Sequence, residues 1–284
     1  MINRDRNHPS VFAWGVCNEI NGQNPPAYRF AERLHEESKK LDPNRLATYA
    51  SNSLYKTPEK DVAGKMDFIE WNEYYESWHM GTVEDIKKNL EEIHRAFPGK
   101  PIVISEYGYC ECTPDRTGGD ARKIEILREH NQVYRRYDYV AGAIFFCYND
   151  YRTHIGDKGV GALKQRVHGV VDLYGSRKPS FDALRQESSP IAELRVKPEG
   201  DLFAITVVTR KDLPAYALHG YRVRGIAFIE GDLPMEQREG ALPRLDPGER
   251  ATVTLQFKIA KPARVKVDVL RPMGHSVFTT DWRA

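Results

Sequence analysis

Short apolar runs alternate with amphipathic stretches along the first 187 residues. Residues 11–17 and 101–105 are continuous apolar runs, which is typical of strands buried on both faces of a sheet. Residues 25–41 begin with two prolines and carry Phe30, Leu34 and Leu41 on one predicted helical stripe. Strands and helices follow one another without hairpin turns, so the pattern predicts parallel βαβ units. We expect strands at residues 11–17, 46–49, 66–72, 101–105 and 141–147, and helices at residues 25–41, 83–97, 120–137 and 180–185.

The pattern changes after Glu187, where strand-like alternation replaces helical spacing. Turn residues such as those at 198–200 and 246–248 separate these segments. The sequence therefore predicts two domains, an α/β domain over residues 1–187 and an immunoglobulin-like β-sandwich over residues 188–284. We expect its strands at residues 202–209, 221–229, 251–259 and 263–270, and a loop at residues 231–249.

Composition narrows the classes of function. The 42 basic and 40 acidic residues nearly cancel, so no excess of positive charge favours nucleic acid. The longest apolar runs have about eight residues, well short of a membrane span. The four cysteines are too sparse for a disulfide scaffold, so we expect a cytoplasmic protein. We also expect no cofactor. Cys110 and Cys112 form a lone pair without the spacing of a zinc site, so we expect no metal.

Two glutamates stand at equivalent places in the predicted strands. Asn18 and Glu19 end the run at residues 11–17, and Glu106 ends the run at residues 101–105. The carboxyl ends of parallel barrel strands face the active site, so both glutamates would lie at one mouth. Two carboxyl groups across such a mouth are what glycoside cleavage requires. The alternative is that each glutamate is an ordinary solvated residue at a strand end.

Three segments resemble glycoside hydrolase family 2, which includes β-galactosidases, β-glucuronidases and β-mannosidases. Residues 4–19, which end in Asn18-Glu19, resemble the acid/base signature of that family, and residues 100–108 resemble its nucleophile segment. Between them, Asn72-Glu73-Tyr74-Tyr75 resembles its Asn-x-Tyr-Tyr strand end. The resemblance covers residues 1–187 and implies a retaining hydrolase of terminal β-linked sugars.

The resemblance also implies a role for each site residue. Glu19 would be the acid/base and Glu106 the nucleophile, with carboxyl groups about 5–5.5 Å apart for a retaining reaction. Tyr74 would hold the nucleophile and favour its ionised form. The expected substrate-binding residues are Asn18, Asn72, Tyr75 and Trp78, with Asn18 on the sugar 2-hydroxyl and Trp78 as a stacking platform. His79 is a further candidate contact, although a lone histidine is more often structural.

The sequence departs from the family in the extent of its barrel. The Asn-Glu motif closes the fourth barrel strand in the family, and here it stands at residues 18–19. We therefore expect a partial (β/α)8 TIM barrel, equivalent to strands four to eight. Open sheet edges invite pairing, so we expect a homo-oligomer that covers them. The competing interpretation is an inactive or weakly sugar-binding fragment that acts as an assembly module.

The choice of sugar rests on a short segment after the last predicted strand. β-Glucuronidases resemble one another in an Asn-x-Lys motif there, and residues 165–169 lack that motif. Arg166 could substitute for it, but the comparison argues against a glucuronidase. We expect a β-galactosidase-like enzyme, because that is the commonest activity of the family.

Overall fold

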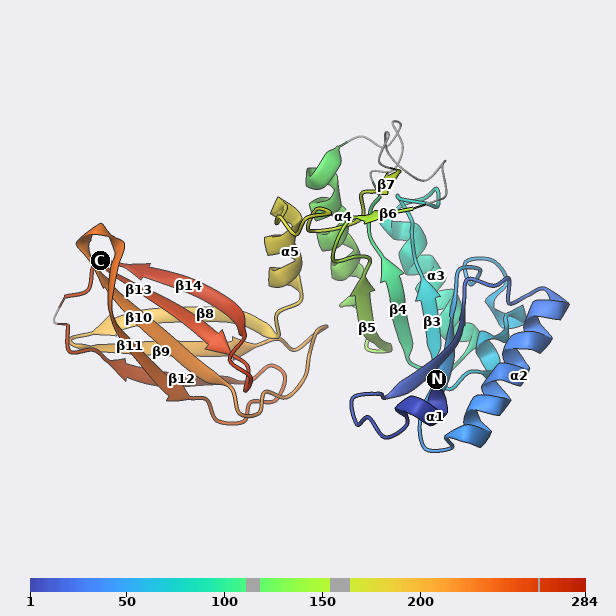
Figure 1. Ribbon diagram of the computed structural model, residues 1–284, viewed down its shortest axis with the longest axis horizontal. Coiled ribbons are helices and arrows are strands. Elements are labelled where there is room, and N and C mark those ends of the chain that lie inside the picture. The colour runs from blue at the N-terminus through green and yellow to red at the C-terminus, as the bar shows by residue number, and fades with distance from the viewer. Residues whose placement is uncertain (111–117, 154–163, 260) are drawn as a thin grey trace. The chain divides into compact units, whose positions relative to one another are not determined.

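The computed structural model describes residues 1–110, 118–153, 164–259 and 261–284. The chain forms two compact units, Met1–Ala183 and Leu184–Ala284, shown in Figure 1. The division falls inside helix α5 (Pro179–Glu187), and the predicted boundary after residue 187 lies at the end of the same helix.

A five-stranded parallel sheet forms the centre of the first unit. Its strands follow the chain in the order β1-β2-β3-β4-β5, so β1 and β5 are the two edges and the sheet does not close. A complete barrel of this kind has eight strands. The predicted partial barrel is confirmed, and its strands are β1 (Ala13–Asn18), β2 (Leu46–Ser51), β3 (Ile69–Asn72), β4 (Ile102–Tyr107) and β5 (Val140–Phe145).

Helices follow the strands as the alternating pattern predicts. A capping box of Thr82 and Asp85 starts α3, in which both side chains bond backbone N–H groups. The helix predicted at residues 120–137 is shorter than expected, because α4 ends at Tyr134. The helices are α1 (Ile2–Asp5), α2 (Pro25–Leu41), α3 (Val83–Ala96) and α4 (Gly119–Tyr134), with 3₁₀ turns η1 (Pro58–Lys60) and η2 (Val62–Lys65).

The apolar stripe predicted on α2 is wrong. Phe30 is 56% exposed and Leu41 is also exposed, whereas Ala31 and Ser38 are the buried residues of the helix. Ser38 is satisfied inside the helix, because its hydroxyl donates to the carbonyl of Leu34 at 2.7 Å. A small residue and a hydrogen-bonded polar residue thus form the packed face, and apolar spacing alone could not identify it.

Burial of the strands depends on their place in the sheet. In β3 both Ile69 and Trp71 are fully buried, as expected for a strand covered on both faces. The same expectation is wrong at the edges, because Phe12 beside β1 is 70% exposed and Ile144 in β5 is 57% exposed. An edge strand lacks a neighbour on one side, so its continuous apolar sequence does not imply complete burial.

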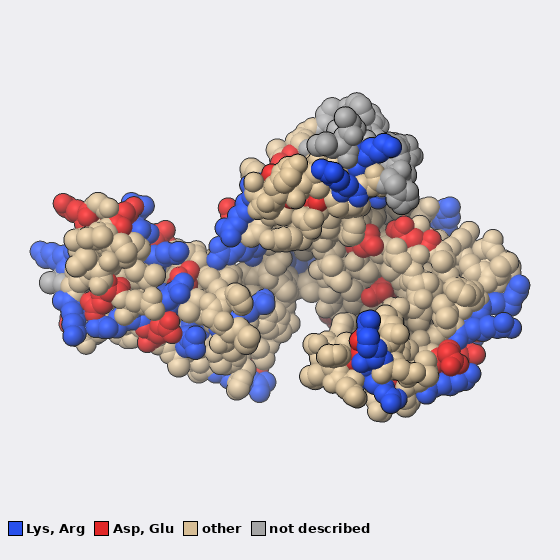
Figure 2. Space-filling view, viewed as in Figure 1, with Lys and Arg blue, Asp and Glu red and all other residues tan. Residues whose placement is uncertain are grey.

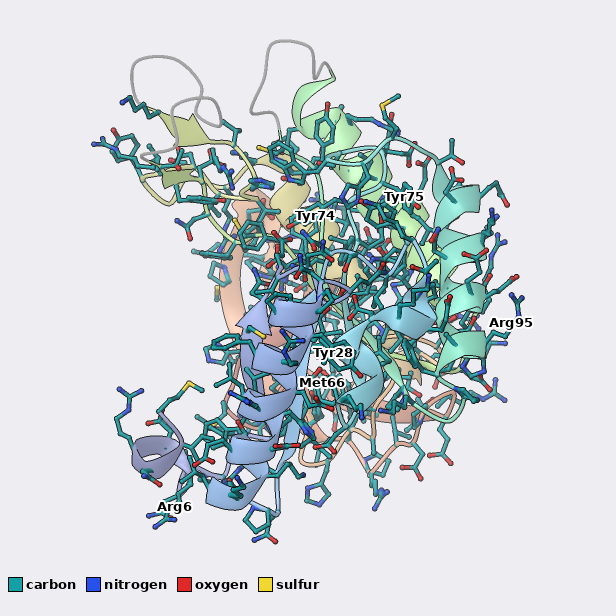
Figure 3. The ribbon with its side chains drawn as sticks, turned by 90° about the vertical axis from the view of Figure 1, so that its right-hand side faces the viewer. Arg6, Tyr28, Met66, Tyr74, Tyr75 and Arg95 are labelled. Carbon is teal, nitrogen blue, oxygen red and sulfur yellow. The ribbon has the colours of Figure 1, made fainter. Side chains whose placement is uncertain are left out.

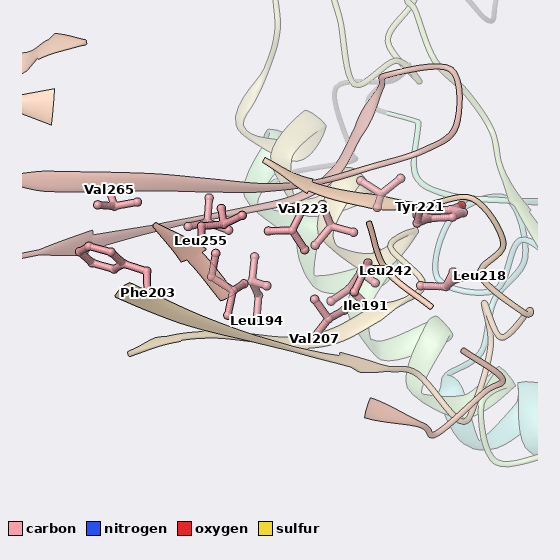
Figure 4. Close-up of a cluster of buried hydrophobic side chains, with 14 of the residues drawn as sticks. Ile191, Leu194, Phe203, Val207, Leu218, Tyr221, Val223, Leu242, Leu255 and Val265 are labelled. Carbon is pink, nitrogen blue, oxygen red and sulfur yellow. The ribbon is translucent and has the colours of Figure 1, made fainter. Parts of the chain in front are cut away.

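The second unit consists of antiparallel sheets, as predicted. One sheet has the order β11-β10-β13-β14 and the other β12-β9-β8. Burial alternates strictly along β9, and Figure 4 shows the apolar core formed by residues such as Phe203, Val223 and Leu255. The strands are β8 (Ile191–Glu199), β9 (Leu202–Thr209), β10 (Arg222–Ile229), β11 (Leu233–Ala241), β12 (Arg250–Gln256), β13 (Arg264–Leu270) and β14 (Ser276–Arg283). The more specific immunoglobulin-like assignment stays a prediction.

The predicted loop at residues 231–249 is wrong, because it contains β11. This strand pairs antiparallel with β10 from Arg222↔Ala241 to Ile229↔Leu233. It forms the edge of its sheet, and none of its residues is fully buried. A strand without a fully buried face carries no alternating apolar pattern, so hydrophobic periodicity could not predict it.

Charges of both signs are interspersed on the visible face of each unit (Figure 2). Within the described residues, no helix is long and apolar enough to cross a lipid bilayer.

We expect association through the open edges of the parallel sheet. Light scattering at micromolar concentration should give a dimer or a larger species, since unpaired strands with exposed apolar residues favour pairing. Ile144→Lys should shift the distribution toward monomer, because a charge at an edge opposes pairing. Met273→Lys is the matched control, as Met273 is 85% exposed in the second unit. A monomeric wild-type protein would contradict this expectation.

Candidate active site

A cavity of about 590 Å³ lies at the carboxyl ends of the parallel strands. Asn18 is the last residue of β1, Asn52 follows β2 and Glu106 lies near the end of β4. The five strand ends therefore converge on one space, as the parallel arrangement requires. The cavity is lined by Asn18, Glu19, Asn52, Tyr74, Trp78, His79, Glu106, Phe146, Arg166 and His168.

The pairing of β3 with β4 fixes the position of Glu106. Asn72 lies opposite Glu106 in the register, and the backbone N–H of Glu73 donates to the carbonyl of Glu106 at 2.8 Å. The next residue, Tyr74, donates its phenolic hydrogen to Oε2 of Glu106 at 2.7 Å. The register is irregular at Trp71/Asn72 and at Ile104/Tyr107, and such irregularities re-aim side chains near functional sites.

Asn72 connects the end of β1 with β4 through side-chain hydrogen bonds. Its side chain is fully buried, and its amide nitrogen lies 3.1 Å from Oδ1 of Asn18 and 3.0 Å from Oε1 of Glu19. Its amide oxygen accepts a hydrogen bond from the hydroxyl of Ser105 at 2.7 Å. The residue therefore positions Asn18 and Glu19 and does not line the cavity itself, which differs from its predicted role in binding substrate.

Glu19 adopts an unusual backbone conformation at the end of the edge strand. Its φ is 52°, in the left-handed region that residues other than glycine rarely enter. Its backbone N–H donates to the carbonyl of Ala50 at 2.9 Å, which ties the residue to β2. Such conformations persist where surrounding structure enforces them, and they concentrate at functional sites.

The environment of Glu106 differs from the sequence-based expectation of a readily ionised nucleophile. Burial raises the pKa of the Glu106 carboxyl, the hydrogen bond from Tyr74 partly offsets the rise, and the charge of Glu19 adds to it. The tyrosine thus opposes the increase, as expected, but it does not outweigh burial. Burial and the nearby carboxylate also raise the pKa of Tyr74, so its hydroxyl remains a hydrogen-bond donor.

The sequence comparison agrees with this arrangement. The family description "Glycosyl hydrolases family 2, TIM barrel domain" matches residues 1–161, more than half of the chain. The chain belongs to glycosyl hydrolase family 2.

Curated relatives of this family 2 chain are considerably longer. A β-glucuronidase of Paenibacillus borealis is 30% identical over 69% of this chain and 32% of its own length. A β-glucuronidase of Sus scrofa is 32% identical over 69% of this chain and 29% of its own length. The chain thus spans about a third of the relatives it matches.

Solved structures share the fold of the family 2 chain. A β-D-glucuronidase of Dictyoglomus thermophilum aligns with a TM-score of 0.55 at 27% identity, covering 65% of this chain and 33% of its own. A β-galacturonidase of Eisenbergiella tayi, bound to galacturonate, gives a TM-score of 0.58 at 23% identity, over 66% and 34% of the two chains.

Tyr75 does not line the cavity, in contrast to its predicted role. Its backbone N–H donates to Oε1 of Glu73 at 2.6 Å, and its hydroxyl accepts a hydrogen bond from the Asn89 side chain at 3.0 Å. Asn89 lies on α3, so Tyr75 faces the helical layer, whereas Tyr74 bonds Glu106. Figure 3 labels both tyrosines, with Tyr75 nearer to the helices than Tyr74. Consecutive residues at a strand end point to opposite sides, which explains the separation.

Trp78 lines the cavity, as expected for a stacking platform. It lies beside residues 165–169, the segment that lacks the Asn-x-Lys motif. The guanidinium of Arg166 lies 5.6 Å from the centre of the Trp78 ring, and the His168 ring lies 5.8 Å from it. Asn52 and His168 were not predicted as site residues. Asn52 directly follows β2 in the structure, but it stands three residues beyond the end of the strand predicted at residues 46–49, so its place at a strand end was not evident from the sequence.

Asp150 anchors the segment that carries Arg166 and His168. Its carboxylate accepts hydrogen bonds from the backbone N–H of Gly169 at 2.8 Å and from the side chain of Gln165 at 3.2 Å. The Lys178 ammonium lies 2.8 Å from the same carboxylate. Lys123, fully buried, donates to the carbonyl of Gly169 at 2.9 Å, so the segment is held at several points.

A buried ionic network lies behind the Asn72–Tyr75 segment. Glu73 and His130 are both completely buried, with Nδ1 of His130 2.9 Å from Oε2 of Glu73. The Tyr134 hydroxyl donates to the same carboxylate oxygen at 2.5 Å, and Nε2 of His130 lies 3.4 Å from Glu76. Burial lowers the pKa of His130, but the two carboxylates outweigh it and raise the pKa to about 9.

Cys110, one of the two cysteines considered for a metal, is not a free thiol. Cys110 is buried and disulfide-bonded, and Cys112 lies outside the described residues. Among the residues that the structure describes, no group of three or more His, Cys, Asp or Glu side chains could hold a metal ion.

Replacing the donor to Glu106 should change its ionisation. Tyr74→Phe removes the hydrogen bond that stabilises the carboxylate, so the pKa of Glu106 should rise further. Carbon NMR of glutamate labelled at the carboxyl carbon would follow the titration. Tyr148→Phe, at an exposed tyrosine, is the control and should leave it unchanged. An unchanged Glu106 pKa in Tyr74→Phe would show that the hydrogen bond is unimportant.

The buried histidine should give stability a specific pH dependence. The pKa of His130 is raised on folding, so its contribution is fully present below about pH 6.5 and is lost as pH rises through about 9. His130→Gln leaves Glu73 without its cation and should cost about 3–5 kcal/mol at pH 6.

Urea unfolding from pH 6 to pH 9.5 would measure this difference between wild type and His130→Gln. The gap in unfolding free energy should narrow toward the alkaline end of that range. His8→Gln, at an exposed histidine, provides the control. A gap that stays constant with pH would argue that His130 is not charged in the folded protein.

Proposed function

We propose that this family 2 chain carries the catalytic end of a retaining β-glycosidase barrel and acts on β-linked uronides. The observation that carries the proposal is the hydrogen bond from Tyr74 to Glu106, in a cavity that Glu19 also lines. A retaining glycosidase reaction requires two carboxyl groups in different surroundings.

The chemistry assigns one step to each glutamate. Glu106 would attack the anomeric carbon while Glu19 donates a proton to the glycosidic oxygen, which breaks the bond and leaves a covalent glycosyl ester. Water, deprotonated by Glu19, would then release the sugar from Glu106 with its original configuration. Tyr74 would act as a donor that favours the ionised nucleophile, and Asn72 would hold Glu19 in place.

A positively charged residue in the cavity supports the choice of a uronide. Arg166 lines the cavity, with its guanidinium over Trp78 and one nitrogen 3.2 Å from the Tyr151 hydroxyl. A guanidinium offers several N–H donors to a carboxylate, so it suits an acidic sugar better than a neutral one. The relatives named above are β-glucuronidases, which replaces the sequence-based expectation of a galactoside as the favoured substrate.

The alternative of an inactive or weakly sugar-binding fragment has one structural argument. Asn18 and Glu19 are exposed and belong to the open edge formed by β1, so among the described strands none lies beyond this side of the cavity. A sugar bound there would have fewer contacts than in a closed barrel.

Hydrolysis of phenyl β-D-glucuronide and phenyl β-D-galactoside separates these proposals. Wild type should cleave the glucuronide faster, and Glu106→Gln should lose more than about 10³-fold in kcat, since it lacks the nucleophile. Arg166→Gln should lower kcat/KM for the glucuronide by about 10–100-fold and leave the galactoside unaffected.

Arg152→Gln provides a matched control, because the exposed Arg152 lies in the short strand β6 (Tyr151–Arg152), which pairs antiparallel with β7 (Gln165–Arg166). Absence of turnover on either glycoside would favour the fragment interpretation. Equal loss on both glycosides in Arg166→Gln would refute the uronide assignment.

A further inference from the structure

A second cavity adjoins the candidate active site. It has a volume of about 530 Å³ and shares two lining residues, Asn52 and His79, with the first cavity. Side-chain amides dominate its wall, which also includes a lysine and a tyrosine. The amide residues are Asn21, Gln23, Asn24 and Asn52.

The chain places this second cavity directly beside Glu19. Asn21, Gln23 and Asn24 follow Glu19 within five residues and line the second cavity, while Glu19 itself lines the first. In glycoside cleavage the acid protonates the oxygen of the departing group. The departing group must therefore lie next to Glu19, and the second cavity is the adjacent space lined by the residues after it.

The polar groups of the second cavity match hydroxyl groups. A side-chain amide that is not already bonded to the wall, such as that of Asn24, offers both donors and an acceptor, which suits sugar hydroxyls that act in both ways. His79 also lines this cavity. Burial lowers the pKa of His79, so its neutral ring can accept or donate a hydrogen bond.

An aromatic face completes the lining. The Tyr55 ring lies 4.9 Å from the His79 ring, centre to centre, and the Lys56 ammonium lies 5.2 Å from the Tyr55 ring. Aromatic side chains combine a large apolar face with a polar edge, which suits the C–H face and the hydroxyl rim of a pyranose.

We infer that the second cavity binds the leaving group and that this group is a glycosyl unit. The substrate class is then a uronosyl oligosaccharide, with the terminal uronic acid in the first cavity and the next sugar in the second. This inference rests on the proposed hydrolase function, because the position of the leaving group follows from the role of Glu19.

Gln23 and Asn24 both line the second cavity, but their side chains have different roles. The Gln23 side chain donates to the carbonyls of Ser53 and Thr57 at 3.2 and 3.1 Å, so it holds the cavity wall. Asn24 precedes α2, and within the described residues its side chain caps no backbone N–H of that helix. Its amide is therefore available to a ligand, and Asn24→Ala should leave the helix intact.

Calorimetric binding in the Glu106→Gln background tests the inference without turnover. The probes are cellobiouronic acid, a glucuronosyl glucose disaccharide, and phenyl β-D-glucuronide. Asn24→Ala should weaken binding of the disaccharide about 5–10-fold, as expected for one lost hydrogen bond, and change binding of the phenyl glycoside less than about twofold. Asn44→Ala, at an exposed asparagine beyond the other end of α2, should change neither.

The outcomes distinguish failure of the leaving-group site from failure of the proposed hydrolase function. No binding of the disaccharide, or the same affinity change for both probes in Asn24→Ala, would overturn the leaving-group site. Selective weakening of the disaccharide supports it. If wild type hydrolyses neither probe while this selective weakening is seen, the hydrolase function fails and the sugar-binding cavity stands.

Discussion

The backbone pairing of β3 with β4 is the constraint on which the site depends. One hydrogen bond, from the N–H of Glu73 to the carbonyl of Glu106, sets which side chains at and just after the end of β3 point toward the two glutamates. Asn72 and Tyr74 then point toward the glutamates, and Glu73 and Tyr75 point toward the helices. A slip of one residue would exchange these two sets, place a buried carboxylate in the cavity and remove the donor to Glu106.

The sequence predicted the cavity residues correctly where the family motifs and the βαβ pattern point to the same position. The converging strand ends, with Asn18, Glu19 and Glu106, followed from the βαβ pattern and the family motifs. The position of Tyr75 could also have been predicted, because residues alternate along a strand. Two features could not. The polar edge strand β11 has no apolar period, and the raised pKa of Glu106 depends on burial by residues distant in sequence.

The two glutamates are held in position differently, because one lies in a central strand and the other follows an edge strand. Glu106 lies in β4, which has neighbours on both sides, whereas Glu19 follows β1 at the open edge. The position of Glu19 depends on the bond from Asn72 and on the backbone contact with Ala50. A hydrogen bond from a fully buried amide thus contributes part of the positioning that a neighbouring strand supplies to Glu106.

The anchoring of residues 165–169 has a consequence for divergence within the family. Asp150 and Lys123 hold this wall of the cavity, while Tyr74 and the β3–β4 pairing hold Glu106. The two sets of anchors share no residue. His168 is not free to change, because its ring packs edge-on against the Tyr74 ring, with 6.4 Å between the ring centres. The side chain at 166, in contrast, can change without disturbing the nucleophile, so a lineage could acquire new sugar specificities while retaining one inherited catalytic apparatus.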